Sequence, residues 1–226
     1  DVVDQFAKGS WRWACKRAKS GGLGHNVPYW VALQFATAKI GAVLLTVNTN
    51  YREHELRYLL GQSECENIFL IDNLRDHDYI ATLYKIVPEL RTQGRGNLRC
   101  AELPHLKRVC FLGAEKHRGM YSVPEILAMS VMVDDEEYEA RQAALDPWDE
   151  INMQYTSGTT GFPRGVMLTH VGVGSTATGS AATRALRSRT GSACRCRFST
   201  ATAACWAYRP ASTTAPPWSF WKPTIP

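Results

Sequence analysis

Segments with helical and strand-like patterns alternate along residues 26–170, and this alternation constrains the fold more than any other feature of the chain. The first helix is predicted to begin near Pro28, with Asn26 as its cap, and to end at Lys39–Gly41. The later segments are strands at 42–47, 67–71, 107–112 and 151–155, and helices at 54–60, 76–87, 122–129 and 134–145. Such alternation is typical of an α/β domain. We therefore predict a core of parallel strands joined by crossover helices.

A loop rich in glycine and hydroxyl side chains lies near the end of this region. Residues 155–165 read Tyr-Thr-Ser-Gly-Thr-Thr-Gly-Phe-Pro-Arg-Gly, between apolar runs at 151–155 and 166–168. Glycines allow tight turns and bring backbone N–H groups close to a ligand, while serine and threonine add hydroxyl donors. Arg164 adds a permanent positive charge and a planar set of donors suited to phosphate oxygens. Together these residues predict a site that binds a polyphosphate.

A simpler interpretation of the loop stands beside this one. Clusters of glycine, serine and threonine also occur in ordinary hairpin loops that bind nothing. A Walker P-loop requires Gly-Lys-Ser/Thr at the start of a helix, whereas Arg164–Val166 leads into a strand-like run. The sequence therefore excludes a Walker site and leaves a purely structural hairpin as the alternative to a nucleotide site.

At its full length the loop resembles the signature loop of the adenylate-forming (AMP-binding) enzymes, which include acyl-CoA synthetases, firefly luciferase and the adenylation domains of peptide synthetases. The family form is Tyr-Thr-Ser-Gly-Thr-Thr-Gly-x-Pro-Lys-Gly, so this chain departs from it only at Arg164. Within 1–9 and 26–170 the chain is also similar to the amino-terminal domain of fatty acid–CoA ligases. The segments that carry this likeness are Asn26–Trp30, Lys39–Val43, Asn48–Tyr51, His54–Leu56, Asp78–Tyr79, Pro88–Leu90, Leu103–Lys107 and Ile151–Gln154.

The resemblance implies an ATP-dependent fatty acid–CoA ligase. Such enzymes join a carboxylate to AMP, release pyrophosphate and pass the acyl group to coenzyme A. The implied substrate is a medium- or long-chain fatty acid, and Mg²⁺ would help the arginine to neutralise phosphate charge. No catalytic residue and no metal ligand is assigned. The residues implied to hold the β- and γ-phosphates of ATP are Thr156, Ser157, Gly158, Thr159, Thr160, Gly161 and Arg164.

Other motifs of the family are not found in the sequence. There is no Tyr-Gly-x-Thr-Glu segment for adenine and Mg²⁺, no Thr-Gly-Asp segment for ribose, and no carboxy-terminal lid with its catalytic lysine. We therefore expect this chain alone to be inactive in pyrophosphate exchange, since many contacts to the transition state are missing. Two alternatives remain open. One is another adenylating ligase, such as an aryl-CoA ligase or a peptide synthetase adenylation domain, and the other is a non-catalytic pseudogene fragment.

Two segments depart from the family pattern. Residues 10–25 lack the hydrophobic helix end and the strand that the resemblance implies there, and residues 172–226 are rich in Ala, Ser, Thr and Arg without one acidic residue. We interpret both as reading-frame shifts in a G+C-rich gene, with a native disordered tail as the alternative for the second. The predicted organisation is a partial AMP-binding amino-terminal domain at 1–171 and a low-complexity tail. The chain opens with Asp1 rather than Met, so we expect a fragment.

Charge and cysteine content argue against other classes of protein. The net charge of +5 arises from the region after Glu150, the last acidic residue, and its arginines lack the interleaved aromatic residues of a nucleic-acid-binding surface. The seven cysteines form no ordered framework, which favours a reduced, cytoplasmic protein. The longest apolar stretch, at 30–47, is interrupted by Gln34 and Lys39, so no transmembrane segment is predicted.

Overall fold

The computed structural model of this chain describes residues 1–176 except 12, 14–15, 26, 97 and 157–162. Its main feature is a seven-stranded sheet with the strand order β7-β6-β3-β1-β2-β8-β9. All neighbouring strands are parallel except β8 and β9, which are antiparallel. The strands are β1 Lys19–Leu23, β2 Val43–Thr46, β3 Asn67–Leu70, β6 Arg108–Phe111, β7 Met120–Ser122, β8 Glu150–Thr156 and β9 Arg164–Thr169, and a separate hairpin consists of β4 Asn73–Leu74 and β5 His77–Asp78.

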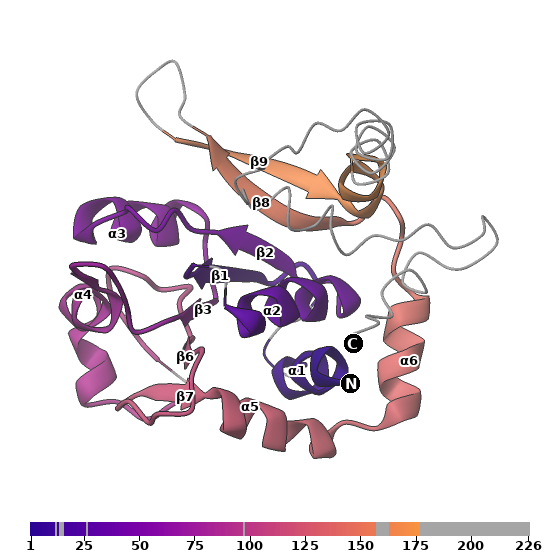
Figure 1. Cartoon of the computed structure of the whole chain (residues 1–226), viewed down its shortest axis with the longest axis horizontal. Helices are drawn as coiled ribbons and strands as arrows, with labels where there is room; N and C mark the ends of the chain where they lie inside the picture. The colour runs from indigo at the N-terminus through magenta and orange to yellow at the C-terminus, as the bar shows by residue number, and fades with distance from the viewer. Residues whose placement is uncertain (12, 14–15, 26, 97, 157–162, 177–226) are drawn as a thin grey trace, which may run out of the picture.

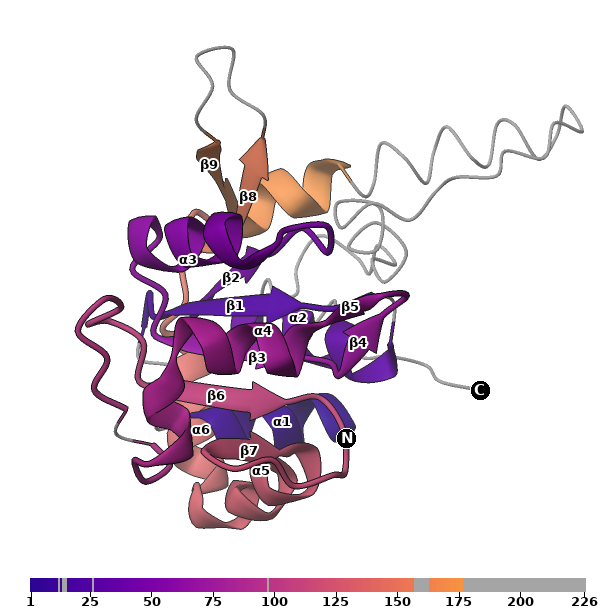
Figure 2. The ribbon, with the colours of Figure 1, turned by 90° about the vertical axis from the view of Figure 1, so that its left-hand side faces the viewer.

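Helices cover both faces of the sheet, as Figures 1 and 2 show. The helices α1, α2 and α5 pack together on one face, and α3 and α4 lie on the other. The helices are α1 Val2–Ser10, α2 Pro28–Lys39, α3 Glu53–Gln62, α4 Tyr79–Ile86, α5 Val123–Met129 and α6 Asp135–Ala143, with 3₁₀ turns η1 Pro88–Arg91 and η2 Ser130–Met132 and a further helical segment at 170–176. This three-layer arrangement confirms the predicted α/β class.

The helix predicted at 76–87 begins later than expected. It starts at Tyr79, because the side chain of Asp78 caps it by accepting a hydrogen bond of 2.8 Å from the Ala81 N–H. His77 and Asp78 form the strand β5 of the small hairpin instead. The start of α2 at Pro28 is confirmed, with Val27 rather than Asn26 at the cap position. Asn26 itself lies outside the described residues.

The strand β1 stands at the centre of the sheet, in a segment where no strand was predicted. It pairs in parallel with β2 on one side and with β3 on the other. Its sequence contains Gly21 and Gly22, which carry no strand propensity. A methyl group at Gly21 would lie 3.2 Å from the Cys65 Sγ, and one at Gly22 would lie 3.3 Å from the Trp30 Nε1. Close packing on both faces of the sheet therefore accounts for glycine at these two strand positions. The frame-shift interpretation of residues 10–25 stays a prediction.

The capping box predicted at Ser122 is confirmed at the start of α5. The Glu125 carboxylate accepts hydrogen bonds from the Ser122 N–H at 2.9 Å and from the Ser122 hydroxyl at 3.0 Å. Arg95 donates to the other oxygen of Glu125 at 2.7 Å. The backbone bond from Ser122, followed by the contacts with Arg95, lowers the pKa of Glu125 to about 2.

Replacing Glu125 with alanine should destabilise the protein by about 1–2 kcal/mol at pH 7. The pKa of Glu125 is lower in the folded protein than in the unfolded chain. Its contribution is therefore fully present above about pH 4.5 and is lost as the pH falls towards 2. Urea denaturation of the wild type and the variant at several pH values measures this difference. The variant Glu139→Ala, on the exposed face of α6, serves as a control. A difference that does not shrink in acid would contradict the prediction.

Candidate functional site

The glycine-rich loop closes the hairpin of β8 and β9 at the carboxyl edge of the sheet. The strand β8 pairs in parallel with β2, so its last residue, Thr156, lies at the edge where the other parallel strands also end. The β8–β9 ladder runs up to the pair Thr156–Arg164, so the loop leaves directly from the last pair of the ladder. In open α/β sheets, ligands bind outside the carboxyl ends of the strands. The pair Thr156–Arg164, from which the loop leaves, therefore lies at the edge where this class of fold binds its ligands.

The two ends of the loop are the only predicted site residues that the described part of the chain contains. Thr156 and Arg164 face each other across the hairpin and are exposed. Side chains that lie directly opposite in an antiparallel pair project from the same face of the sheet. A hydroxyl donor and a guanidinium therefore stand side by side at the mouth of the loop. The other predicted residues, Ser157, Gly158, Thr159, Thr160 and Gly161, lie outside the described residues.

The carboxyl edge also contains the point where the chain reverses its order in the sheet. From β1 the chain moves to β2 on one side, and from β2 it crosses to β3 on the other side of β1. Such a reversal opens a crevice at the carboxyl ends of the strands. The segment Asn48–Tyr51, which follows β2, borders this edge. It is fixed there by Tyr79, whose hydroxyl donates a 2.8 Å hydrogen bond to the Thr49 carbonyl.

An aromatic cavity of about 250 Å³ lies at the foot of the loop, between α3 and the hairpin. From the hairpin, Tyr155 and Pro163 contribute to its wall, and the Tyr155 hydroxyl donates a hydrogen bond to the Gln62 side chain. Burial, with smaller contributions from Tyr58 and other neighbours, raises the pKa of Tyr155 to about 12. The phenol therefore stays protonated and remains a donor at neutral pH. The residues from the α3 side of the cavity are Tyr51, His54, Glu55, Tyr58 and Leu59.

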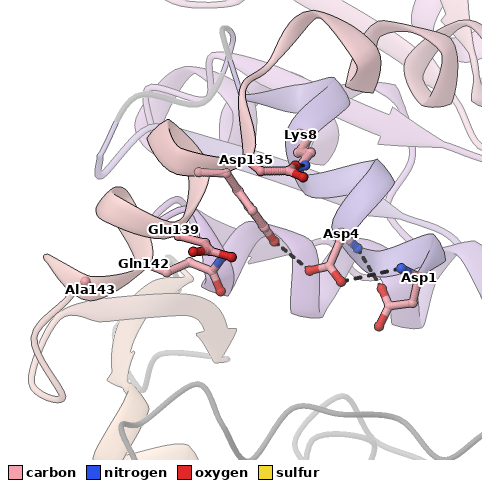
Figure 3. A pocket seen from close by; sticks show the side chains of 8 residues that line it. Asp1, Asp4, Lys8, Asp135, Glu139, Gln142 and Ala143 are labelled. Atoms are coloured by element: carbon pink, nitrogen blue, oxygen red, sulfur yellow. Dashed lines mark hydrogen bonds and ion pairs between the residues drawn. The ribbon is translucent and has the colours of Figure 1, made fainter.

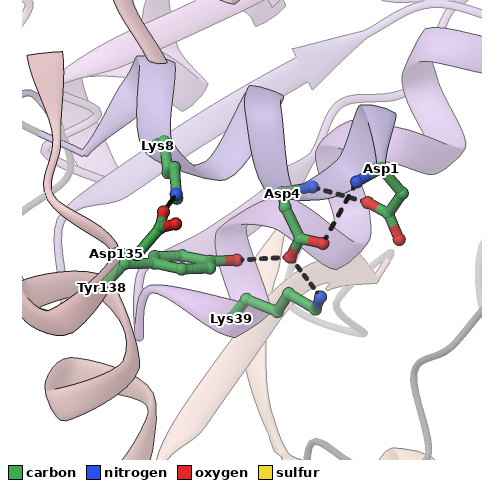
Figure 4. A network of polar contacts seen from close by, with 6 residues as sticks. All are labelled: Asp1, Asp4, Lys8, Lys39, Asp135 and Tyr138. Carbon is green, nitrogen blue, oxygen red and sulfur yellow. Dashed lines mark hydrogen bonds and ion pairs between the residues drawn. The ribbon is translucent and has the colours of Figure 1, made fainter. Parts of the chain in front are cut away.

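A second hollow lies far from the loop, between α1 and α6 (Figure 3). Its centre is the Asp4 carboxylate, which accepts hydrogen bonds from the Tyr138 hydroxyl at 2.8 Å and from the Lys39 ammonium at 2.5 Å (Figure 4). Lys8 and Asp135 form a further ion pair beside it. Burial raises the pKa of Asp4, but the bonds from Lys39 and Tyr138 outweigh this effect and lower it. The network joins α1, α2 and α6, and its charges neutralise one another, so we assign it a structural role.

Comparison with known protein families identifies the family of this chain. A sequence profile described as AMP-binding enzyme matches residues 21–209 of this chain. The chain belongs to the AMP-binding enzyme family. The match begins within β1, the strand that was not predicted, and confirms the resemblance inferred from the loop.

Curated relatives of this AMP-binding enzyme are named as acyl-CoA synthetases and ligases. YngI of Bacillus subtilis (strain 168), named as an acyl-CoA synthetase, is 47% identical over 148 residues, which are 66% of this chain and 27% of YngI. The mitochondrial medium-chain acyl-CoA ligase ACSF2 of Macaca fascicularis is 34% identical over 160 residues, which are 70% of this chain and 26% of that ligase. The chain therefore spans about a quarter of the length of these relatives.

Solved structures show the same fold. The long-chain-fatty-acid–CoA ligase FadD1 of Archaeoglobus fulgidus aligns with a TM-score of 0.56 and 25% identity over 80% of this chain and 31% of its own. The amino-terminal domain of FACL13 from Mycobacterium tuberculosis aligns with a TM-score of 0.54 and 21% identity, over 80% of this chain and 38% of that domain's chain. In the part of this AMP-binding enzyme that the structure describes, no helix is both long and apolar enough to cross a membrane.

Proposed function

We propose that this chain provides the ATP-phosphate site of a fatty acid–CoA ligase. The observation that carries the proposal is the pair Thr156–Arg164, exposed on one face at the mouth of a glycine-rich loop and at the carboxyl edge of the sheet. Membership of the AMP-binding family and the names of the relatives support the same activity. The ligase would join a carboxylate to AMP and then transfer the acyl group to coenzyme A.

The residues at the loop suit the phosphate end of ATP. The Thr156 hydroxyl can donate to a phosphate oxygen, and Arg164 offers several N–H donors and a permanent charge. The glycines at 158 and 161 would let backbone N–H groups approach the same oxygens. When bound, ATP supplies the adenylyl group that turns the carboxylate into a mixed anhydride. Fixed positive charge and donors at the departing pyrophosphate lower the barrier, because the charge is met by groups already in place. Mg²⁺ would share this role.

The substrate class rests on the relatives, two of which are named for medium-chain acyl groups and long-chain fatty acids. A medium- or long-chain fatty acid is therefore the proposed substrate. An aryl acid is the second candidate, because the anthranilate–CoA ligase AuaEII shares the fold, with a TM-score of 0.55. Competition between decanoate and benzoate in a complete ligase that carries this region separates the two. For the compartment we propose the cytoplasm, since the cysteines of the described region, Cys65, Cys100 and Cys110, are free thiols.

Binding of pyrophosphate to the purified chain tests the proposed phosphate site. Calorimetric titration with magnesium pyrophosphate should show one site, and sodium sulfate at equal ionic strength serves as the control for non-specific anion binding. Thr156→Val keeps the shape of the side chain and removes its donor, so it should weaken the binding several-fold, by about the value of one hydrogen bond to a charged group. If the wild-type chain shows no pyrophosphate binding at millimolar concentration, the proposed site is wrong.

Arg164→Lys should raise the turnover of a complete ligase that carries this loop. Arginine forms planar, paired contacts with phosphate oxygens, whereas lysine acts as a compact point charge, so the arginine should hold pyrophosphate longer. Steady-state rates of acyl-CoA formation and stopped-flow measurement of pyrophosphate release check this together. We expect both rates to rise in the variant. Unchanged or lower turnover would count against a release-limited step at Arg164.

A further inference from the structure

A side-chain hydrogen bond connects Tyr155, at the foot of the loop, to α3. The Tyr155 hydroxyl donates to the Gln62 Oε1, and the two residues are 93 positions apart in the sequence. Gln62 is the last residue of α3, and Tyr155 is the residue before the Thr156–Arg164 pair. The bond therefore connects the helical layer to β8 at the residue before the Thr156–Arg164 pair.

The hairpin is shaped to let the Tyr155 ring make this contact. The residue opposite Tyr155 in β9 is Gly165. A methyl group at Gly165 would lie 3.4 Å from the Tyr155 ring and 3.2 Å from the Met153 Sδ, so glycine leaves room for both side chains on this face. On the other side of the loop, Pro163 reaches the wall of the same aromatic cavity. Tyr155 and Pro163, from the two sides of the loop, thus border the same cavity beside α3.

We propose that Gln62 is a positioning residue that acts through Tyr155 to fix the pair Thr156–Arg164 for phosphate binding. This inference rests on the proposed function, because it assumes that the loop binds phosphate. Gln62 lies on the surface and accepts its hydrogen bond from the Tyr155 hydroxyl, so its effect would pass through the phenol. Loss of the bond would let the end of β8 at Thr156 sample more orientations, and the cost of ordering it would then fall on ligand binding.

Three substitutions separate this role from a general loss of structure. Gln62→Leu and Tyr155→Phe each remove the hydrogen bond, and each should weaken magnesium pyrophosphate binding by about three- to tenfold. Because both remove the same contact, the double variant should be no weaker than either single variant. Gln62→Glu keeps an acceptor oxygen and should restore the affinity. Gln5→Leu, on the exposed surface of α1, controls for the added apolar side chain.

Hydrogen exchange provides a readout that does not depend on pyrophosphate. In Gln62→Leu, the amides next to the loop in β8 and β9 should exchange faster, while those of β1 and β3 should be unchanged. If the wild type does not bind pyrophosphate, the proposed function is wrong and the exchange rates alone decide the role of Gln62. Unchanged exchange in Gln62→Leu overturns the inference. Equal pyrophosphate affinity of the wild type and Gln62→Leu also overturns it, and so does a failure of Gln62→Glu to restore binding.

Discussion

Replacing Gly9 with alanine should destabilise the protein by about 2–4 kcal/mol. Gly9 lies in α1 where this helix touches α5, and a methyl group there would stand 1.9 Å from the Ile126 carbonyl oxygen and 2.8 Å from its carbon. Both neighbours are backbone atoms, so no side-chain rotation relieves the clash and the two helices must separate. Urea denaturation followed by circular dichroism measures the change in free energy of unfolding.

A matched glycine in another helix provides the control for Gly9. Gly61 lies in the last turn of α3, and a methyl group there would meet only the Leu103 Cδ2, at 3.6 Å. Gly61→Ala should therefore stabilise the protein by about 0.5–1 kcal/mol, because alanine loses less backbone entropy on folding. The two substitutions are chemically identical and should have opposite signs. Equal stability of Gly9→Ala and the wild type would show that α1 and α5 are not in close contact.

Arg164→Ala should weaken the binding of magnesium pyrophosphate by about 10- to 100-fold. A hydrogen bond to a charged group contributes about 1.5–3 kcal/mol, and each 1.4 kcal/mol changes the affinity about tenfold. Arg164 is exposed at the mouth of the loop, so its removal should change binding without loss of the fold. Titration calorimetry at low and moderate salt measures the affinity, and added salt should narrow the difference.

A second cation far from the loop tests whether the effect of Arg164 is local. Lys85→Ala removes one positive charge from the exposed surface of α4 and should leave the affinity within about twofold, because charges beyond about 10 Å are largely screened at 0.1 M salt. The variant Arg164→Lys keeps the charge at the loop and should fall between the wild type and Arg164→Ala in affinity. If Arg164→Ala and Lys85→Ala reduce binding equally, the interaction depends on net charge and not on the loop.

Most of the fold follows from local patterns in the sequence. The structure contains the strands predicted near 42–47, 67–71 and 107–112 and the helix predicted from Pro28. These elements could be predicted because they have regular apolar patterns and are bounded by residues that end helices and strands. The centre of the sheet could not be predicted in the same way. The residues Lys19–Leu23 have little strand propensity, and their position depends on pairing with β2 and β3 and on packing against side chains such as Trp30 and Cys65.

In the candidate site, too, the sequence alone predicts local motifs, whereas contacts between distant residues become visible only in the structure. The loop could be found from its composition and order, because glycines, hydroxyls and an arginine in one short segment have a direct chemical meaning. The structure adds that Thr156 and Arg164 face each other. The role proposed for Gln62 had no signal in the sequence. Nothing near this residue distinguishes it from any polar helix terminus, and only the folded chain brings it to Tyr155.

Gly21 and Gly22, in the middle of β1, limit which substitutions the centre of the sheet can accept. A methyl group at Gly21 would press on Cys65, and one at Gly22 would press on Trp30 of α2, each closer than ordinary van der Waals contact. A larger residue at Gly22 would push α2 away from the sheet, and one at Gly21 would push against Cys65 and β3, so the adjoining strands would be displaced. Because β2 joins β1 to β8, a substitution at either glycine would be transmitted to the strand that ends at Thr156.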